Sequence, residues 1–247
     1  MIIKVFASGS KGNSIYLKIE NEEFLIDIGI SYTRLLKELK NLNRDINNIK
    51  LIITHFHSDH IKGLKQYLKK NNNPIYIMDY GLNDYDFSDY LEKINILEEK
   101  NSFNNVVLQT FPLSHDVSNI GLLFESENHS YVHITDTGYI NYRYEELLAN
   151  KEYYLIESNY DEDMLLGGNY TYYLKQRILS DEGHLSNKMA TTFLNKVIGV
   201  NTKGIIFGHI SDENNTYDLC LENALNNISN VEIYIAKQLE GCEEIND

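Results

Sequence analysis

Short apolar runs separated by polar turns dominate the first part of the chain. The segments IIKVF (2–6), SIYLKI (14–19) and EEFLIDIG (22–29) each have the length and apolar content of one β-strand. A helical stretch near 32–42 follows, and the strand KLIIT (50–54) then ends directly before His55. The pattern predicts strand pairs first, followed by a helix and a further strand.

The rest of the chain alternates strands with helices. In 59–70, the residues Ile61, Leu64 and Leu68 form one apolar stripe of a helix. Further strands are expected at 75–78, 105–112, 119–126, 130–135, 153–157, 203–207 and 231–235, and helices near 142–150, 186–198 and 216–228. Segment 79–104 has no clear period, and we expect a helix plus an exposed loop there.

This mixture is typical of a layered α/β architecture in which helices cover the sheets. No Pro/Gly/Ser linker or low-complexity tract divides the chain, so we predict a single domain over residues 1–247. No apolar run approaches the length of a membrane span, and the first residues lack the basic start and apolar core of a signal peptide. We therefore expect a cytoplasmic protein with no membrane partner, in which Cys220 and Cys242 are free thiols.

The net charge narrows the classes of partner. The chain has 22 Lys plus Arg against 36 Asp plus Glu, which gives a net charge of −14. A protein that holds nucleic acid over its whole surface has the opposite balance. A polyanionic substrate must therefore be held locally.

The stretch THFHSDH (54–60) concentrates candidate metal ligands where a strand ends: His55, His57, Asp59 and His60. Imidazole nitrogen and carboxylate oxygen suit zinc and other transition metals, and this spacing can supply two adjacent ions. A coincidental polar loop would leave three histidines unpaired within six residues. We therefore favour a metal site.

Further ligands follow three later strands. His115 lies in FPLSHD, Asp136 in HITDTG and His209 in IIFGHIS, each after an apolar run. Strands that end at one edge of a sheet hold such side chains rigidly. We expect the ligands to converge there.

In this order, H-x-H-x-D-H followed by a His, an Asp and a final His resembles the metallo-β-lactamase superfamily. The resemblance covers nearly the whole chain and implies an α/β, four-layer αββα sandwich. Within that superfamily the chain is similar to the WalJ/YycJ/VicX group of DNA exonucleases. The motifs that carry this similarity are ASGSKGNS, FLIDIGIS, THFHSDHIKGL, SHD, TDTG, ESNYDEDML, RILSDEGHLSN and GHISDENN.

The resemblance implies two divalent metal ions, zinc or manganese, with iron as a further option. One ion would be held by His55, His57 and His115, the other by Asp59, His60 and His209, and Asp136 would bridge them. Two such ions, about 3.5–4 Å apart, clamp a phosphodiester and make a bridging hydroxide available for in-line attack.

By the same similarity, His184 in SDEGHLSN would be the general acid to the leaving oxygen, and Asp59 is also assigned to catalysis. A carboxylate such as Asp181 or Glu182 would orient His184. The alternative is a histidine that only satisfies a loop. Asp27 would support the metal histidines from behind, although a turn Asp is nearly as plausible.

Two clusters are candidates for substrate contacts. The Gly/Ser loop SGSKGNS (8–14) would bring backbone N–H groups and side chains close to a phosphate, although such loops are usually hairpin turns. The aromatic and basic run from Tyr170 to Arg177 would stack bases and hold phosphates, and core tyrosines with a solvated basic edge are an equal alternative. The candidate residues are Ser8, Ser10, Lys11, Asn13, Tyr172, Arg177 and Ser211.

Two other histidines are set aside. Side chains alternate along a strand, so His133 is expected to point to the face opposite Asp136. His129 lies in a turn between strands, where we expect it to be exposed to solvent.

We therefore predict a two-metal phosphodiester hydrolase, with a DNA exonuclease acting on a DNA end as first choice. A phosphodiesterase for cyclic nucleotides or another small diester is the alternative, and a non-catalytic regulatory module ranks last because all seven implied ligands are present. The choice between DNA and RNA, the direction of digestion and the oligomeric state, with a homodimer as one option, are left open.

Overall fold

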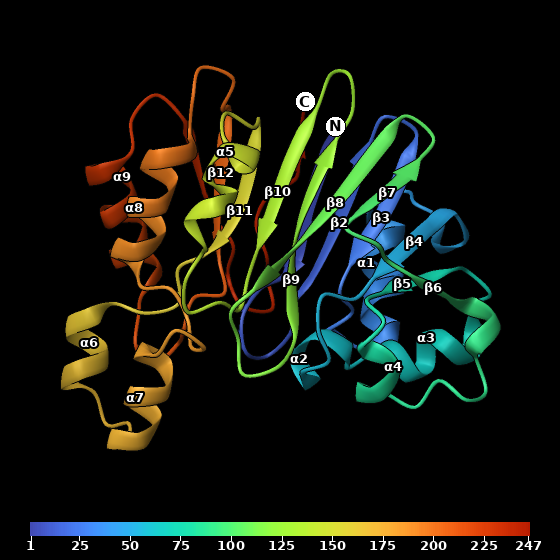
Figure 1. Ribbon diagram of the computed structural model, residues 1–247, viewed down its shortest axis with the longest axis horizontal. Coiled ribbons are helices and arrows are strands. Elements are labelled where there is room, and N and C mark those ends of the chain that lie inside the picture. The colour runs from blue at the N-terminus through green and yellow to red at the C-terminus, as the bar shows by residue number, and fades with distance from the viewer.

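Two seven-stranded β-sheets lie face to face in the computed structural model, which describes residues 1–247 (Figure 1). The first sheet has the order β14-β1-β2-β3-β4-β5-β6. Its strands are β1 (Ile2–Ala7), β2 (Ser14–Ile19), β3 (Glu22–Ile26), β4 (Ile49–Ile52), β5 (Ile75–Ile77), β6 (Ile94–Ile96) and β14 (Ile245–Asn246). The second sheet has the order β13-β12-β11-β10-β9-β8-β7. Its strands are β7 (Lys100–Phe103), β8 (Val106–Leu113), β9 (Asn119–Glu125), β10 (Ser130–Ile134), β11 (Tyr153–Glu157), β12 (Gly204–Gly208) and β13 (Glu232–Ile235).

The direction of the strands decides which loops meet. In the first sheet β3 and β4 are parallel neighbours, so both end at the same edge. In the second sheet β8 is antiparallel to β9, and β9 is antiparallel to β10. The strands β10, β11 and β12 are parallel neighbours. Consequently β8, β10, β11 and β12 all end at one edge.

Helices cover the outer faces of both sheets, which gives the four-layer αββα sandwich and confirms the predicted fold class. The first sheet packs against α1 (Tyr32–Asn41) and α3 (Leu64–Lys70), and the second against α5 (Glu145–Leu148), α8 (Asn187–Val197) and α9 (Tyr217–Asn227). Between the sheets, one apolar cluster joins residues from Ile3 to Ile245 and includes the packed rings of Phe24 and Phe124. This cluster draws on both halves of the chain.

The predicted helix over 59–70 is divided at Gly63 into α2 (Ser58–Ile61) and α3. The backbone N–H of Gly63 donates to Ile28 O at 2.8 Å, and a Cβ at Gly63 would lie 2.5 Å from Ile30 O. Only glycine permits this close approach of two backbones. The break fixes the short α2, which carries His60, against the loop after β3.

Several elements were not predicted. Segment 79–104 contains α4 (Gly81–Asp84), β6 and the start of the β7–β8 hairpin, and the predicted helix near 142–150 is α5 preceded by a 3₁₀ turn. The helices α6 (Glu162–Gly167) and α7 (Tyr172–Leu179) lie together beyond the ends of the strands (Figure 1). The 3₁₀ segments are Ile46–Asn48, Leu91–Lys93 and Tyr142–Tyr144.

None of the helices has both the length and the apolar character that a membrane span requires.

Candidate metal centre

Polar side chains follow the strands that end at the shared edge. Asp27 follows β3, His55 comes three residues after β4, His115 follows β8, Asp136 follows β10 and His209 follows β12. Three of these residues adopt left-handed backbone conformations, with φ of 60° at Asp27, 58° at Asp136 and 52° at His209. Such conformations cost about 1–3 kcal/mol in a non-glycine residue and persist only where neighbouring groups hold them.

Hydrogen bonds stabilise the left-handed turns at these three residues. Thr54 donates from its backbone and its hydroxyl to the Asp27 carboxylate, both at 2.8 Å. The Asn119 side chain donates to Asp136 O at 2.7 Å, and the backbone N–H of His209 donates to Ser8 Oγ at 2.8 Å. The strained turns are therefore fixed before any ligand binds.

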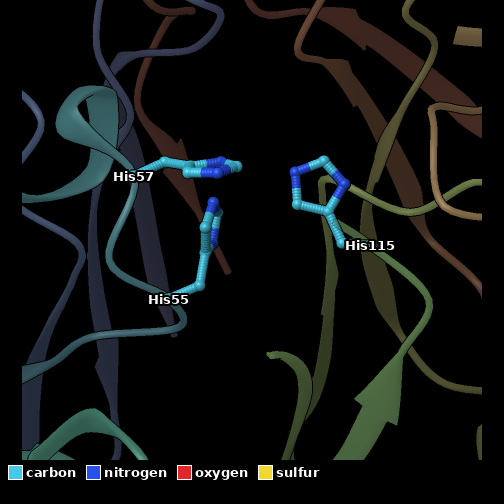
Figure 2. Close-up of side chains that lie close together, drawn as sticks. All are labelled: His55, His57 and His115. Carbon is cyan, nitrogen blue, oxygen red and sulfur yellow. The ribbon is translucent and has the colours of Figure 1, made fainter. Parts of the chain in front are cut away.

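The first group of converging side chains consists of His55, His57 and His115, whose ligand nitrogens lie within 4.8 Å of one another. Figure 2 shows the three rings pointing toward a common space, two from the loop after β4 and one from the loop after β8. His115 Nδ1 lies 3.1 Å from Glu182 O, which leaves Nε2 to face this space. The Nε2 atom of His55 is buried and has no hydrogen-bond partner.

The second group consists of Asp59, His60 and His209, with the same spacing limit of 4.8 Å. Both rings are held from behind by carboxylates. His60 Nδ1 lies 2.7 Å from Asp27 Oδ2, and His209 Nδ1 lies 3.2 Å from Glu157 Oε2. The Nε2 atom of His209 is likewise buried without a partner.

Asp136 lies between the two groups. Its Oδ2 is 3.1 Å from His60 Nε2, and its Oδ1 is 3.3 Å from His209 Nε2 and 4.0 Å from His115 Nε2. One carboxylate therefore faces ligands from both groups, as a bridging ligand requires.

The donor set fits divalent metal ions. Buried polar atoms in proteins almost always have a hydrogen-bond partner, so the unpaired nitrogens of His55 and His209, one in each group, are suited to a bound ligand. Zinc and similar ions are usually bound by imidazole and carboxylate groups, and the second nitrogen of each imidazole is usually hydrogen-bonded to a further carboxylate or carbonyl oxygen. The seven residues singled out from the sequence all take part in these groups, and Glu157 and His184 join Asp136 and His209 in a further group with the same spacing.

The pKa shifts show how strongly these charges interact. Burial, reinforced by the neighbouring His60, holds the pKa of His55 well below its ordinary value. Burial also favours the neutral ring of His60, but the carboxylates of Asp27 and Asp136 outweigh it and raise the pKa of His60 to about 10. In the protein without cations, a proton on His60 thus partly offsets the local negative charge, and a bound cation would take over that role.

Glu157, at the end of β11, is a central residue that the sequence analysis did not assign. It is fully buried, accepts hydrogen bonds from the backbone N–H groups of Thr137 and Leu185, and lies 3.0 Å from His184 Nδ1. The same carboxylate contacts His209, so it links the candidate general acid to a candidate metal ligand. Glu157 follows the rule that found the candidate ligands, because it ends an apolar strand at the shared edge.

This geometry corrects the predicted partner of His184. Asp181 and Glu182 are exposed, and neither places its carboxylate on the His184 ring. Glu182 contributes its backbone oxygen to His115 instead. A buried Glu that is held by two backbone N–H groups fixes a ring better than a mobile surface carboxylate.

The predicted substrate contacts divide into three sets. Ser10, Arg177 and Ser211 line a cavity of about 190 Å³ beside the metal ligands, together with His184 and Tyr170. Ser8 and Asn13 are buried instead, each with 2% exposure. The Ser8 hydroxyl holds the backbone of His209, and the Asn13 amide lies 2.9 Å from His60 Nε2.

The two remaining predicted contacts lie outside this cavity. Lys11 is exposed and forms an ion pair with Asp212 at 2.5 Å. Tyr172 is 71% exposed on the first turn of α7. A substrate would reach either residue only if it extended beyond the cavity.

Asp116 is a second residue that the sequence analysis missed. Its Oδ1 lies 3.4 Å from His57 Nε2 and 3.2 Å from His115 Nε2, and its Oδ2 pairs with Arg177. Asp116 therefore connects the first histidine group to α7. Its position directly after His115 in the chain was the available signal.

The two histidines that were set aside have different surroundings. His133 is fully buried, with Nδ1 3.3 Å from the Tyr131 hydroxyl, and it belongs to none of the ligand groups. His129 is half-buried and not solvent-exposed as predicted, because Glu152 Oε2 lies 3.2 Å from its Nδ1. The turn lies against the residue that precedes β11, and sequence spacing does not reveal this contact.

Known proteins match over most of the chain. The family model described as β-lactamase superfamily domain matches residues 22–210. Exodeoxyribonuclease WalJ of Streptococcus pneumoniae is 34% identical over 238 residues, which is 93% of this chain and 88% of that protein. Exodeoxyribonuclease YycJ of Bacillus anthracis is 33% identical over 223 residues, 87% of this chain and 84% of that protein.

Solved structures show the same fold. The metallo-β-lactamase fold protein YhfI of Bacillus subtilis has a TM-score of 0.75 at 16% identity and covers 99% of both chains. The short form of human tRNase Z has a TM-score of 0.69 at 17% identity over 100% of this chain and 99% of that chain. At such low identity the likeness concerns the fold alone.

Proposed function

This chain belongs to the metallo-β-lactamase superfamily, within the family of the exodeoxyribonucleases WalJ and YycJ, and we propose that it is itself a two-metal exodeoxyribonuclease. The observation that carries this proposal is the pair of ligand groups that share Asp136, with unpaired buried nitrogens on both sides. Two divalent cations held there would supply an activated water as nucleophile and would neutralise charge on the phosphate. The names of the relatives direct the choice of substrate toward DNA.

In this proposal the cation sites are divided as the two groups suggest. His55, His57 and His115 hold one ion, and the other is held by Asp59, His60 and His209, with Asp136 facing both. The set of imidazoles and carboxylates suits zinc and manganese, and iron also accepts it. Asp27 and Glu157 fix the ring orientations of His60 and His209.

His184 is the candidate general acid. Its Nδ1 is engaged by Glu157 at 3.0 Å, and the ring lines the cavity beside the metal ligands, which leaves Nε2 as the nitrogen able to reach a substrate. A buried carboxylate on Nδ1 stabilises the protonated ring until the proton passes to the leaving oxygen. Ser10, Ser211 and Arg177 offer donors to the same phosphate from the cavity wall.

The acidic surface supports action on an end of DNA more than on an extended duplex, because a net charge of −14 repels a long polyanion. A cytoplasmic location is in keeping with a nuclease of this kind. The cyclic-nucleotide alternative and the non-catalytic alternative have no separate feature in their favour, and the complete ligand set argues against the second.

The test is a substrate panel applied to the metal-loaded protein. We expect stepwise release of nucleotides from linear, 5′-phosphorylated DNA, no cleavage of closed circular single-stranded DNA, and little turnover of RNA or cyclic nucleotides. Chelation should remove the activity, and manganese or zinc should restore it. Cleavage of the closed circle, or turnover of cyclic nucleotides alone, would contradict the proposal.

A matched pair of variants completes this test. His55→Ala removes a ligand, whereas His129→Ala removes a half-buried histidine in the turn between β9 and β10. The first should lose both metal and activity, and the second should keep both.

A further inference from the structure

Among the five candidate ligand histidines, His57 has the least support for its ring. The other four each have one ring nitrogen within 3.2 Å of an oxygen that lies outside the two ligand groups. These contacts join His55 Nδ1 to Thr54 Oγ1, His60 Nδ1 to Asp27 Oδ2, His115 Nδ1 to Glu182 O, and His209 Nδ1 to Glu157 Oε2. The side chain of His57 is 30% exposed, and the oxygen beside its ring is Oδ1 of Asp116, 3.4 Å from Nε2. A ligand imidazole is usually fixed through its second nitrogen, so Asp116 is the candidate partner.

Asp116 is well placed for this role. It directly follows His115 in the loop after β8, and its Oδ1 also lies 3.2 Å from His115 Nε2. Asp116 belongs to none of the groups whose ligand atoms all lie within 4.8 Å of one another. The carboxylate therefore lies at the rim of the first histidine group, where it can accept a hydrogen bond from a ring without being one of the converging ligands.

Arg177 holds the other oxygen of this carboxylate. Its Nη2 donates to Asp116 Oδ2, so the two carboxylate oxygens have different neighbours. Arg177 lies on α7, and the backbone N–H of His184 donates to Ile178 O at 3.1 Å, which joins the end of this helix to the loop of the candidate general acid. The guanidinium lines the cavity, and one bond to Asp116 leaves further N–H donors for a phosphate there. The ion pair thus links α7 to the first histidine group.

We propose that Asp116 is a positioning residue for the cation of the first group. It accepts a hydrogen bond from His57 Nε2, which turns Nδ1 toward the space shared with His55 and His115, and Arg177 keeps the carboxylate in this position. This inference rests on the proposed two-metal function. It adds a residue through which α7 acts on one of the two cations.

The first experiment measures cation affinity without any substrate. Zinc is titrated into the metal-free full-length protein in competition with a chromophoric chelator. Asp116→Ala should weaken the binding of one of the two zinc ions by about 10- to 100-fold, the usual loss when the partner of a ligand histidine is removed. Asp212→Ala is the matched control, because Asp212 is likewise paired with a basic side chain, that of Lys11, but has no histidine beside it. This control should keep both affinities.

The conservative variant separates orientation from charge. Asp116→Asn removes the charge but keeps an oxygen that can accept from the His57 ring. It should therefore weaken the same zinc ion much less than Asp116→Ala does. A direct carboxylate ligand, or an effect of charge alone, would make the two variants equally weak, and this result would overturn the positioning role.

The sign of the effect at Arg177 gives a second test. Loss of a positive charge beside a cation should by itself strengthen zinc binding. If Arg177 acts by holding Asp116, Arg177→Ala should instead weaken the first zinc ion, by no more than about fivefold because the pair is exposed. In the Asp116→Ala background the same substitution should no longer weaken binding. Tighter binding in the single variant, or an equal loss in both backgrounds, would overturn the role of Arg177.

The outcomes separate this inference from the proposed function. Wild-type protein that binds no cation overturns both. Protein that shows the expected zinc affinities but is inert toward linear DNA overturns only the nuclease function. Protein that degrades DNA overturns only the positioning role if Asp116→Ala keeps its zinc affinities. Weakened binding of both zinc ions, together with a lower urea midpoint of metal-free Asp116→Ala, would show a general structural role and would also overturn it.

Discussion

Two clusters of histidine and carboxylate side chains lie at opposite ends of the strands, and they differ in how their polar atoms are satisfied. His129, Glu152 and Asp247 form one of them, near the turn between β9 and β10. There Lys203 Nζ lies 2.8 Å from Glu152 Oε1, and the N-terminal amine lies 3.3 Å from His129 Nε2. Lys203 Nζ also lies 2.5 Å from Asp247 Oδ2, so both carboxylates of that cluster have a lysine partner.

The metal centre has the same residue types without a lysine or an amine beside them. No lysine or arginine forms an ion pair with Asp59, Asp136 or Glu157, and two of the histidine Nε2 atoms are buried without a hydrogen bond. Proximity of ligand-type residues therefore does not define a metal site. The Nε2 atom of His133 is also buried and unpaired, but His133 belongs to no group of ligand-type residues. The distinguishing feature is therefore the convergence of several ligand atoms, some of them buried and unpaired, whose rings are hydrogen-bonded at the other nitrogen.

The largest expected effect comes from the carboxylate shared by the two groups. Asp136→Asn should lower the nuclease rate by about 10³-fold or more and reduce bound metal, because the neutral amide cannot bridge two cations. Metal analysis and initial rates on linear DNA measure both effects. Glu152→Gln makes the same change in the opposite cluster and should alter neither. A fully metal-loaded, active Asp136→Asn protein would contradict the assignment.

The next effect isolates proton transfer from metal binding. His184→Ala should reduce kcat by about 10²- to 10³-fold while the metal content stays unchanged, because the ring donates a proton and does not complete either ligand group. Rates and metal content are measured on the same preparation. Loss of metal in this variant would identify His184 as a ligand. Its Nδ1 lies 3.9 Å from Asp136 Oδ1, a separation that leaves room for such a role.

A third effect concerns His133, which is buried like the ligands but belongs to neither cluster. Burial, with a further contribution from His60, lowers the pKa of His133 to about 3. Below pH 6.5 the unfolded chain binds a proton that the folded protein excludes, so the stability present above pH 6.5 falls as the pH drops toward 3. At about pH 5 the loss amounts to roughly 2 kcal/mol of the free energy of unfolding.

Urea unfolding at pH 7 and pH 5 tests this expectation. Wild-type protein should lose about 2 kcal/mol more than His133→Gln between the two conditions, because the amide does not titrate. Equal losses in the two proteins would refute it.

The smallest effect belongs to the satisfied cluster. Lys203→Ala removes ion pairs whose lysine side chain is 44% exposed, and such pairs contribute up to about 1 kcal/mol. Thermal unfolding should shift by a few degrees at most, with unchanged metal content and DNA turnover. A larger loss, or any loss of activity, would mean that the two ends of the sandwich are coupled.

Most of the metal centre was visible in the sequence because its ligands obey one rule. Each follows an apolar strand, and strands that run in the same direction deliver their ends to the same edge. The same rule applied to Glu157 would have identified it, since it ends the strand before SNYD. The one-domain organisation and the roles of individual residues in catalysis remain predictions.

The sequence was less informative where one side chain has to choose a partner. It offered Asp181 and Glu182 as neighbours of His184, but the fold turns both to solvent and brings Glu157 from a strand 27 residues earlier. The position of Asp116 over two histidine rings, and the exposure of Tyr172 and Tyr173, likewise depend on how α7 packs against the sandwich.

The sequence by itself indicated a layered α/β architecture, most of the strands and the candidate ligand residues, because apolar periodicity and ligand chemistry are local properties, and the family resemblance added the four-layer sandwich. The tertiary structure alone decided which His and Asp atoms remain unpaired and buried. It also decided which carboxylate holds each ring and that Tyr170 lines the cavity. Those features depend on distances between segments far apart in the chain, and a hydrogen bond or a cation distinguishes separations of less than an ångström.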